Sequence, residues 1–252
     1  MTPAPAGLES VRVDLDPPVA TITLDRPQAL NAITPRMLAE LATALEWAGR
    51  EAVVVVLTGA GRAFSAGVDL KALGDRALDG GTVGDLLDLP ARRVIDLIGG
   101  IGAVVIAKVN GHCFTGALEL ALACDIVIAA EEAVFGDTHA KWGLRPTWGM
   151  SQRLPWLAGA ARARYLSYTA ATFTGRQAAD WGLAAVACPR ADLDAATAEV
   201  AATVAANSRG SLAAYKDLYR AAERLTLPAG LAYEAATAYP IDDTEARIAK
   251  FR

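Results

Sequence analysis

Short apolar runs alternate with amphipathic segments through the first 150 residues of the chain. Residues 11–15 and 19–24 are rich in β-branched side chains and flank a proline-containing turn, a pattern that predicts a hairpin. Residues 53–57 and 104–109 are continuous apolar runs, as expected of strands buried on both faces. Alternation of such strands with helical segments predicts an α/β core of parallel strands joined by right-handed crossovers.

Helical periodicity occupies the stretches between these runs. Thr34 followed by Pro35 is typical of a helix start, and apolar residues then recur at helical spacing. Further helices are predicted at 86–98 and 116–123, and a strand is predicted at 125–129. Residues 74–88 combine four glycines with scattered aspartates, which predicts a mobile loop.

The pattern changes after about Ser151, where helix-forming residues dominate and only residues 184–188 look like a strand. The helices predicted in this part cover 162–169, 176–181, 192–206, 211–224 and 241–251. The expected division is an α/β core over residues 1–190 and a helical C-terminal region over residues 191–252.

Composition narrows the classes of protein. The chain has 252 residues, of which 53% are hydrophobic and 21% charged, enough to bury a sizeable core. A net charge of −4 without a Lys/Arg cluster argues against nucleic acid as a partner. Glycines and Lys108 interrupt the richest apolar stretch, so no membrane span is expected. Three cysteines and no secretion signal predict reduced thiols in a cytoplasmic protein.

The sequence lacks the residues and motifs that several common types of catalytic or binding site require. Only two histidines are present, His112 and His139, and no cysteine lies at zinc-ligand spacing from them, so no metal site is predicted. Walker, GxGxxG, GxSxG and HExxH motifs are all missing from the sequence. Ser65 lies in a turn that resembles a nucleophile turn only loosely.

Two small-residue turns, 61–71 and 110–120, carry the candidate chemistry. Each directly follows a buried strand and leads toward a helix, where ligands of open parallel sheets bind. Backbone N–H groups at helix starts point outward, so two such turns could hold one oxygen that becomes negative during a reaction. Glu119 follows Gly116 among apolar neighbours, where burial would raise its pKa toward acid–base use. The alternative is that both turns are ordinary connectors and Glu119 is a cap or a solvated residue.

Taken together, these motifs resemble the crotonase superfamily, also called the enoyl-CoA hydratase/isomerase family. The resemblance covers nearly the whole chain in the expected order. Its segments are 24–27, 29–32, 63–70, 110–119, 123–125, 135–136, 143–144, 146 and 152–154. It implies a crotonase-type spiral of ββα units with a helical C-terminal trimerisation region, assembled as a homotrimer or a dimer of trimers.

The same resemblance implies an enzyme that stabilises the enolate of an acyl-CoA thioester. The backbone N–H groups of Val68 and Gly116 would form its oxyanion hole, and no cofactor would be needed because the thioester is the electron sink. Arg26 and Lys71 are candidates for the CoA phosphates, with solvated surface charge as the alternative. The residues implied to contact coenzyme A, the acyl group or the reacting water are Arg26, Ala66, Asp69, Leu70, Lys71 and Thr147.

Hydratases of this family use two glutamates, and the second falls on His139. Glu119 matches the first glutamate. An imidazole can act as acid or base near neutrality, and Asp137 could pair with it; the alternative is a structural histidine that bonds to a backbone carbonyl. We expect hydration of a 2-enoyl-CoA by Glu119 and His139. The alternatives are an acyl-CoA double-bond isomerase, decarboxylase or hydrolase, and a non-catalytic acyl-CoA-binding protein.

Overall fold

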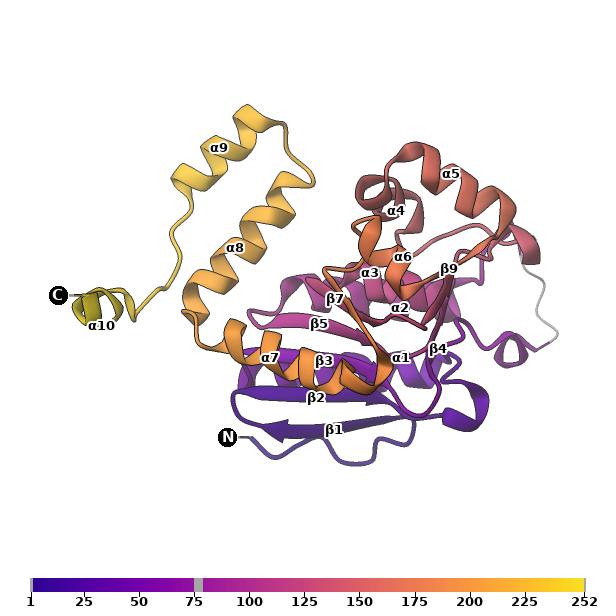
Figure 1. Ribbon diagram of the computed structural model, residues 1–252, viewed down its shortest axis with the longest axis horizontal. Helices are drawn as coiled ribbons and strands as arrows, with labels where there is room; N and C mark the ends of the chain where they lie inside the picture. Colours follow the sequence, from indigo (N-terminus) through magenta and orange to yellow (C-terminus); the bar gives the residue numbers. More distant parts are fainter. Residues whose placement is uncertain (1, 75–78, 252) are drawn as a thin grey trace.

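The computed structural model describes residues 2–74 and 79–251, which form two β-sheets surrounded by helices (Figure 1). The larger sheet has the strand order β1-β2-β3-β5-β7-β10. Strands β1 and β2 form an antiparallel hairpin, and the remaining neighbours are parallel, so both predictions are confirmed. The strand bounds are β1 Val11–Asp16, β2 Val19–Leu24, β3 Val54–Gly59, β5 Val104–Val109, β7 Ile126–Ala130 and β10 Val186–Cys188.

A second, smaller sheet has the order β4-β6-β8-β9, and the hydrophobic pattern does not predict it because each strand has only three residues. Strands β4, β6 and β8 follow β3, β5 and β7 respectively, so each long strand, short strand and following helix forms one ββα unit. A Cβ on Gly59 would lie 2.2 Å from the carbonyl oxygen of Ala63, so only glycine allows the turn from β3 into β4. The bounds are β4 Ala63–Ser65, β6 His112–Phe114, β8 Val134–Gly136 and β9 Thr172–Thr174.

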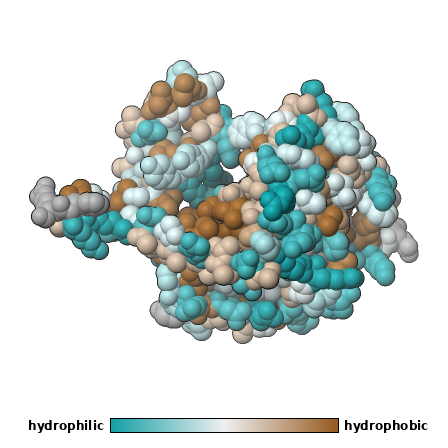
Figure 2. All heavy atoms as spheres, in the orientation of Figure 1, coloured by the Kyte–Doolittle hydropathy of each residue, from teal (hydrophilic) through white to brown (hydrophobic). Residues whose placement is uncertain are grey.

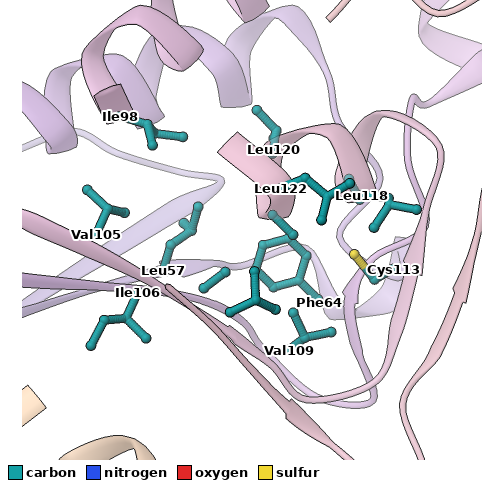
Figure 3. Packing of buried hydrophobic residues seen from close by; sticks show 14 of the residues in the cluster. Leu57, Phe64, Ile98, Val105, Ile106, Val109, Cys113, Leu118, Leu120 and Leu122 are labelled. Atoms are coloured by element: carbon teal, nitrogen blue, oxygen red, sulfur yellow. The ribbon is translucent and has the colours of Figure 1, made fainter. Parts of the chain in front are cut away.

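Three helices complete the core: α1 Pro35–Glu51, α2 Asp85–Gly100 and α3 Gly116–Ala123. The hydroxyl of Thr34 accepts the backbone N–H of Met37 at 3.1 Å and caps α1, as the sequence predicts. Helix α3 is buried on all sides, and Figure 3 shows its leucines packed among side chains of β3 and β5. A glutamate on this helix therefore has to meet polar partners inside the protein.

The segment predicted as a mobile loop, residues 74–88, is partly helical. Residues 75–78 lie outside the described residues. The loop prediction is wrong for residues 85–88, because α2 begins at Asp85 with Gly84 as its N-cap. Asp85 and Asp88 stand in the first turn, where carboxylates complement the helix dipole.

The C-terminal third is mostly helical, as expected, but the hydrophobic pattern misses α4, α9 and strand β9. Helix α7 packs against β3, β5 and β7, and α8 and α9 extend away from the sheets (Figure 1). Lys216 on α8 donates to the carbonyl of Ala103 at 2.8 Å and to Asp125 at 2.7 Å, which ties α8 to the core. The bounds are α4 Met150–Ala158, α5 Ala160–Thr169, α6 Gly175–Asp180, α7 Leu193–Ala205, α8 Arg209–Ala222, α9 Leu227–Ala236 and α10 Thr244–Ile248.

Large apolar side chains are exposed on these last helices. They include Tyr215 and Tyr219 of α8 and Leu227 and Leu231 of α9. Figure 2 shows hydrophobic residues gathered over α9, in contrast to the polar surface around β1. In the described part of the chain, no helix is long and apolar enough to cross a membrane.

Candidate active site

A cavity of about 430 Å³ lies where the three short strands β4, β6 and β8 end. Its wall is built from the segments that directly follow these strands and from residues 141–148. Seven of the residues predicted from the sequence line it: Ala66, Val68, Leu70, Gly116, Glu119, His139 and Thr147. The fold therefore gathers segments from three successive ββα units around one space.

The turns after β4 and β6 lie against each other at the cavity. A Cβ on Gly67 would lie 2.7 Å from the carbonyl oxygen of Phe114, so the close approach of the two turns requires glycine. Gly67 also has φ +88°, a conformation that favours glycine. The hydroxyl of Ser65 accepts the N–H of Gly67 at 3.1 Å, so this serine supports the turn.

The amide of Val68 faces away from its neighbouring segment. Ile33 donates its N–H to the carbonyl of Gly67 at 2.8 Å and accepts the N–H of Asp69 at 2.9 Å. In this parallel bridge the N–H of Val68 points to the opposite side, and Val68 lines the cavity. Gly116 is the first residue of α3 and lines the same cavity. Within residues 2–74 and 79–251, neither amide N–H has a hydrogen-bond acceptor.

Glu119 is held by backbone amides at one oxygen. Its Oε1 accepts the N–H groups of Trp148 at 3.0 Å and Met150 at 2.9 Å, and the side chain is 1% exposed. Burial raises the pKa of Glu119 and outweighs the amides and the nearby His139, which act to lower it. The second oxygen, Oε2, lies 3.6 Å from His139 Nε2.

His139 belongs to a hydrogen-bonded series of side chains behind the cavity. Its Nδ1 lies 2.7 Å from Asp137 Oδ1, and Asp137 Oδ2 accepts the hydroxyl of Ser167 at 2.6 Å. Burial acts to raise the pKa of Asp137, but the hydrogen bonds from His139 and Ser167 outweigh it and lower the pKa. An ionised Asp137 fixes a proton on Nδ1, which leaves Nε2 facing Glu119.

The charged residues predicted to contact coenzyme A lie outside the described cavity wall. Arg26 Nη1 pairs with Asp69 Oδ2 at 3.1 Å and donates to the carbonyl of Ala32 at 2.6 Å. Asp69 Oδ1 accepts the N–H of Lys71 at 3.2 Å. Among the described residues that line the cavity, Arg26, Asp69 and Lys71 do not appear. Asp69 therefore links the side chain of Arg26 to the backbone of Lys71.

The sequence pattern misses other residues of the site. Asp88 accepts the hydroxyl of Thr147 at 2.7 Å and the indole N–H of Trp148 at 2.8 Å. Lys141 and Arg145 line the cavity. Two isolated basic residues are only a weak sequence signal for a binding site. Asp88 gives no sequence signal at all, because its partners are about sixty positions away. In the ranges that the structure covers, no group of three or more His, Cys, Asp or Glu residues is placed to hold a metal ion.

The chain belongs to the enoyl-CoA hydratase/isomerase family, whose model matches residues 16–248. A Rhodobacter capsulatus protein named "probable enoyl-CoA hydratase" is 37% identical over 226 residues, 90% of this chain and 87% of that protein. The hydroxycinnamoyl-CoA hydratase-lyase of Pseudomonas fluorescens is 33% identical over 225 residues, 86% of this chain and 80% of the relative.

Solved structures agree with this membership. A candidate enoyl-CoA hydratase from Thermobifida fusca in complex with CoA has a TM-score of 0.83 and 31% identity, and the match covers 100% of this chain and 99% of that one. The fold is the crotonase fold that the motifs predict, and the chain is an enzyme of the hydratase/isomerase type.

Proposed function

We propose that this protein adds water to the double bond of a 2-enoyl-CoA thioester. The observation that carries the proposal is the pair Glu119 Oε2 and His139 Nε2, 3.6 Å apart at one wall of the cavity. Hydration needs one proton removed from water and one proton delivered to carbon, and two adjacent acid–base groups on the same wall supply both transfers.

In this proposal the thioester carbonyl binds at the turns that follow β4 and β6. The N–H groups of Val68 and Gly116 are directed at its oxygen, which gains negative charge as water attacks the β-carbon. Each donor of such an oxyanion hole contributes about 3 kcal/mol to stabilisation of the transition state. Ala66 and Leu70, beside the first turn, line the path of the pantetheine arm.

Glu119 acts as the base toward water, because its raised pKa makes the ionised form a stronger proton acceptor. As the hydroxyl adds to the β-carbon, Glu119 takes the water proton and the imidazolium of His139 delivers a proton from Nε2 to the α-carbon. The ionised Asp137 stabilises that imidazolium. Glu119 then returns its proton to His139, which restores both groups and balances the addition of one water. In this proposal the N–H of Thr147, a residue of the cavity wall, holds this water.

The remaining assignments belong to the same proposal. Arg26 and the exposed Lys71 are the residues proposed to contact the CoA phosphates. The ion pair between Arg26 and Asp69 supports a second role for Arg26, which is to shape the turn after β4. The exposed apolar side chains of α8 and α9 support assembly as a trimer or a dimer of trimers. The proposed reaction uses no cofactor besides the CoA of the substrate. The proposal places the enzyme in the cytoplasm. It also assigns residues 1–190 to the catalytic core and residues 191–252 to the assembly region.

The test is turnover of 2-enoyl-CoA thioesters from crotonyl-CoA to longer and aromatic acyl groups. Hydration removes the absorbance of the conjugated thioester, and mass analysis of the product identifies the added water. No turnover with any acyl group would remove the proposal. Consumption of a 3-enoyl-CoA without addition of water would instead assign an isomerase.

The two histidines provide a matched pair of variants. His139→Gln removes the proposed acid and should lower kcat by about 10²-fold or more. His112→Gln changes the other histidine, whose ring stacks on Phe114 at 5.6 Å and does not line the described cavity wall, and should keep native kcat. Equal activity of the two variants would assign His139 a structural role.

A further inference from the structure

Asp88 is a buried carboxylate that the proposed proton transfers do not use. It lies in the first turn of α2, is 4% exposed, and its Oδ1 accepts both the hydroxyl of Thr147 and the indole N–H of Trp148. The positive end of the α2 dipole favours a negative charge at this position. Burying a carboxylate is costly, and the hydrogen bonds from Thr147 and Trp148 offset part of that cost.

Trp148 connects Asp88 to both parts of the proposed site. Its backbone N–H donates to Glu119 Oε1 at 3.0 Å. Its ring packs directly on Gly116, where an added Cβ would lie 2.5 Å from ring atom Cζ3. One side chain, fixed by Asp88, therefore touches the residue that carries an oxyanion amide and the segment that holds the catalytic carboxylate.

We propose that Asp88 is a positioning residue that sets the geometry of Glu119 and of the Gly116 amide through Trp148. The inference rests on the proposed function, because it concerns the same enolate site. Without the acceptor, the buried indole N–H loses its partner and the ring is free to turn away from Gly116. The 147–150 segment, whose amides orient Glu119, then loses both of its hydrogen bonds to Asp88.

Two substitutions separate geometry from charge. Asp88→Leu has similar volume but no acceptor, and we expect kcat to fall by about 10²-fold with KM changed by less than about threefold, as for a small displacement of reacting groups. Asp88→Asn keeps an acceptor oxygen and should retain kcat within about tenfold. Intrinsic fluorescence should shift only in the leucine variant, because Trp148 loses its fixed environment.

Glu40 offers a matched control, since it is also a buried carboxylate with directed hydrogen bonds. Glu40 lies on α1, outside the cavity, and its Oε2 accepts the N–H and the hydroxyl of Ser10. Glu40→Leu should lower thermal stability but leave kcat per folded molecule unchanged. Native kcat in Asp88→Leu, or an equal loss in both leucine variants, would overturn the proposal.

If Asp88→Leu does not fold, Thr147→Val decides the question. This variant removes one of the two hydrogen bonds at nearly constant volume, and we expect kcat to fall by about fivefold with KM unchanged. Unchanged kcat in this variant would overturn the positioning role.

A second reaction distinguishes this inference from the proposed function. Exchange of the α-protons of butanoyl-CoA in D₂O, followed by NMR, needs the oxyanion amides and an acid–base group but no hydration. If the native protein exchanges without hydrating, the proposed function fails, and a loss of exchange of about 10²-fold in Asp88→Leu still supports the positioning role. Equal exchange in both proteins, or none in the native protein, contradicts it.

Discussion

The two carboxylates on either side of His139 are both buried, yet their pKa values move in opposite directions. Glu119, on α3, is surrounded by the apolar core, and one of its oxygens accepts two backbone amides. The effect of burial exceeds that of these hydrogen bonds, so the pKa of Glu119 is raised. For Asp137, which follows β8, burial also acts to raise the pKa. Hydrogen bonds from His139 and Ser167 outweigh burial, so the pKa of Asp137 is lowered.

This difference in pKa gives the two carboxylates different roles in the proposed reaction. A carboxylate with a raised pKa exchanges protons readily, whereas one with a lowered pKa stays ionised and serves as a fixed counter-charge. In the proposed reaction Glu119 therefore moves protons, and Asp137 orients His139 and stabilises its charged form. Substitutions at Glu119, Asp137 and Ser167 each disturb one side of this contrast.

Replacing Glu119 by Gln should have the largest effect, because it removes the proton acceptor while keeping the shape of the side chain. We expect kcat for enoyl-CoA hydration to fall by about 10³-fold with little change in KM. Steady-state kinetics check this. A variant that keeps more than about a tenth of native kcat would show that Glu119 does not carry the chemistry.

Replacing Asp137 by Asn should come next. The amide cannot supply the counter-charge and allows the imidazole to turn or change tautomer, so kcat should fall by about 10²-fold. Thermal denaturation should show that the variant remains folded. An Asp137→Asn enzyme with native kcat would contradict the role given to the dyad.

Replacing Ser167 by Ala removes one donor from Asp137 and should lower kcat only a few-fold. The free energy of unfolding should fall by about 1.5–3 kcal/mol near neutral pH, as for hydrogen bonds to charged groups. The pKa of Asp137 is lowered in the folded protein, so this stabilisation is present above its ordinary value of 3.8 and is lost as pH falls through the lower folded value. A stability difference that persists unchanged below that value would contradict the assignment.

The pH profile should show the smallest effect. Because Glu119 must be ionised to accept the water proton and its pKa is raised in the free enzyme, kcat/KM should fall on the acidic side at a pH above the ordinary value of 4.5. Measurement of kcat/KM from about pH 4 to 8 checks this. A plateau that extends below 4.5 would mean that burial does not control Glu119.

The chemistry at Glu119 is predictable from sequence because its signal is local. A carboxylate within an otherwise apolar helix, directly after a glycine turn, indicates burial and a ligand-facing position. The long strands are predictable for the same reason, since a buried strand such as β3 is a continuous apolar run. His139 needed the family motif in addition, because a lone histidine carries no pattern of its own.

Features made by contacts between distant segments could not be predicted. The three-residue strands of the second sheet are too short for a period of two to be visible. Asp88 meets Thr147 and Trp148 only after α2 and the 147–150 segment pack together. Arg26 carried a plausible signal for phosphate, but its guanidinium is paired with Asp69, a contact that spacing does not reveal.

The most direct test of the account is a crystal structure with an unreactive enoyl-CoA analogue. We expect the thioester oxygen within about 3 Å of the nitrogens of Val68 and Gly116, with Glu119 Oε2 and His139 Nε2 both facing the α- and β-carbons. A thioester oxygen remote from both amides, or a Glu119 side chain turned away from the acyl group, would contradict the account.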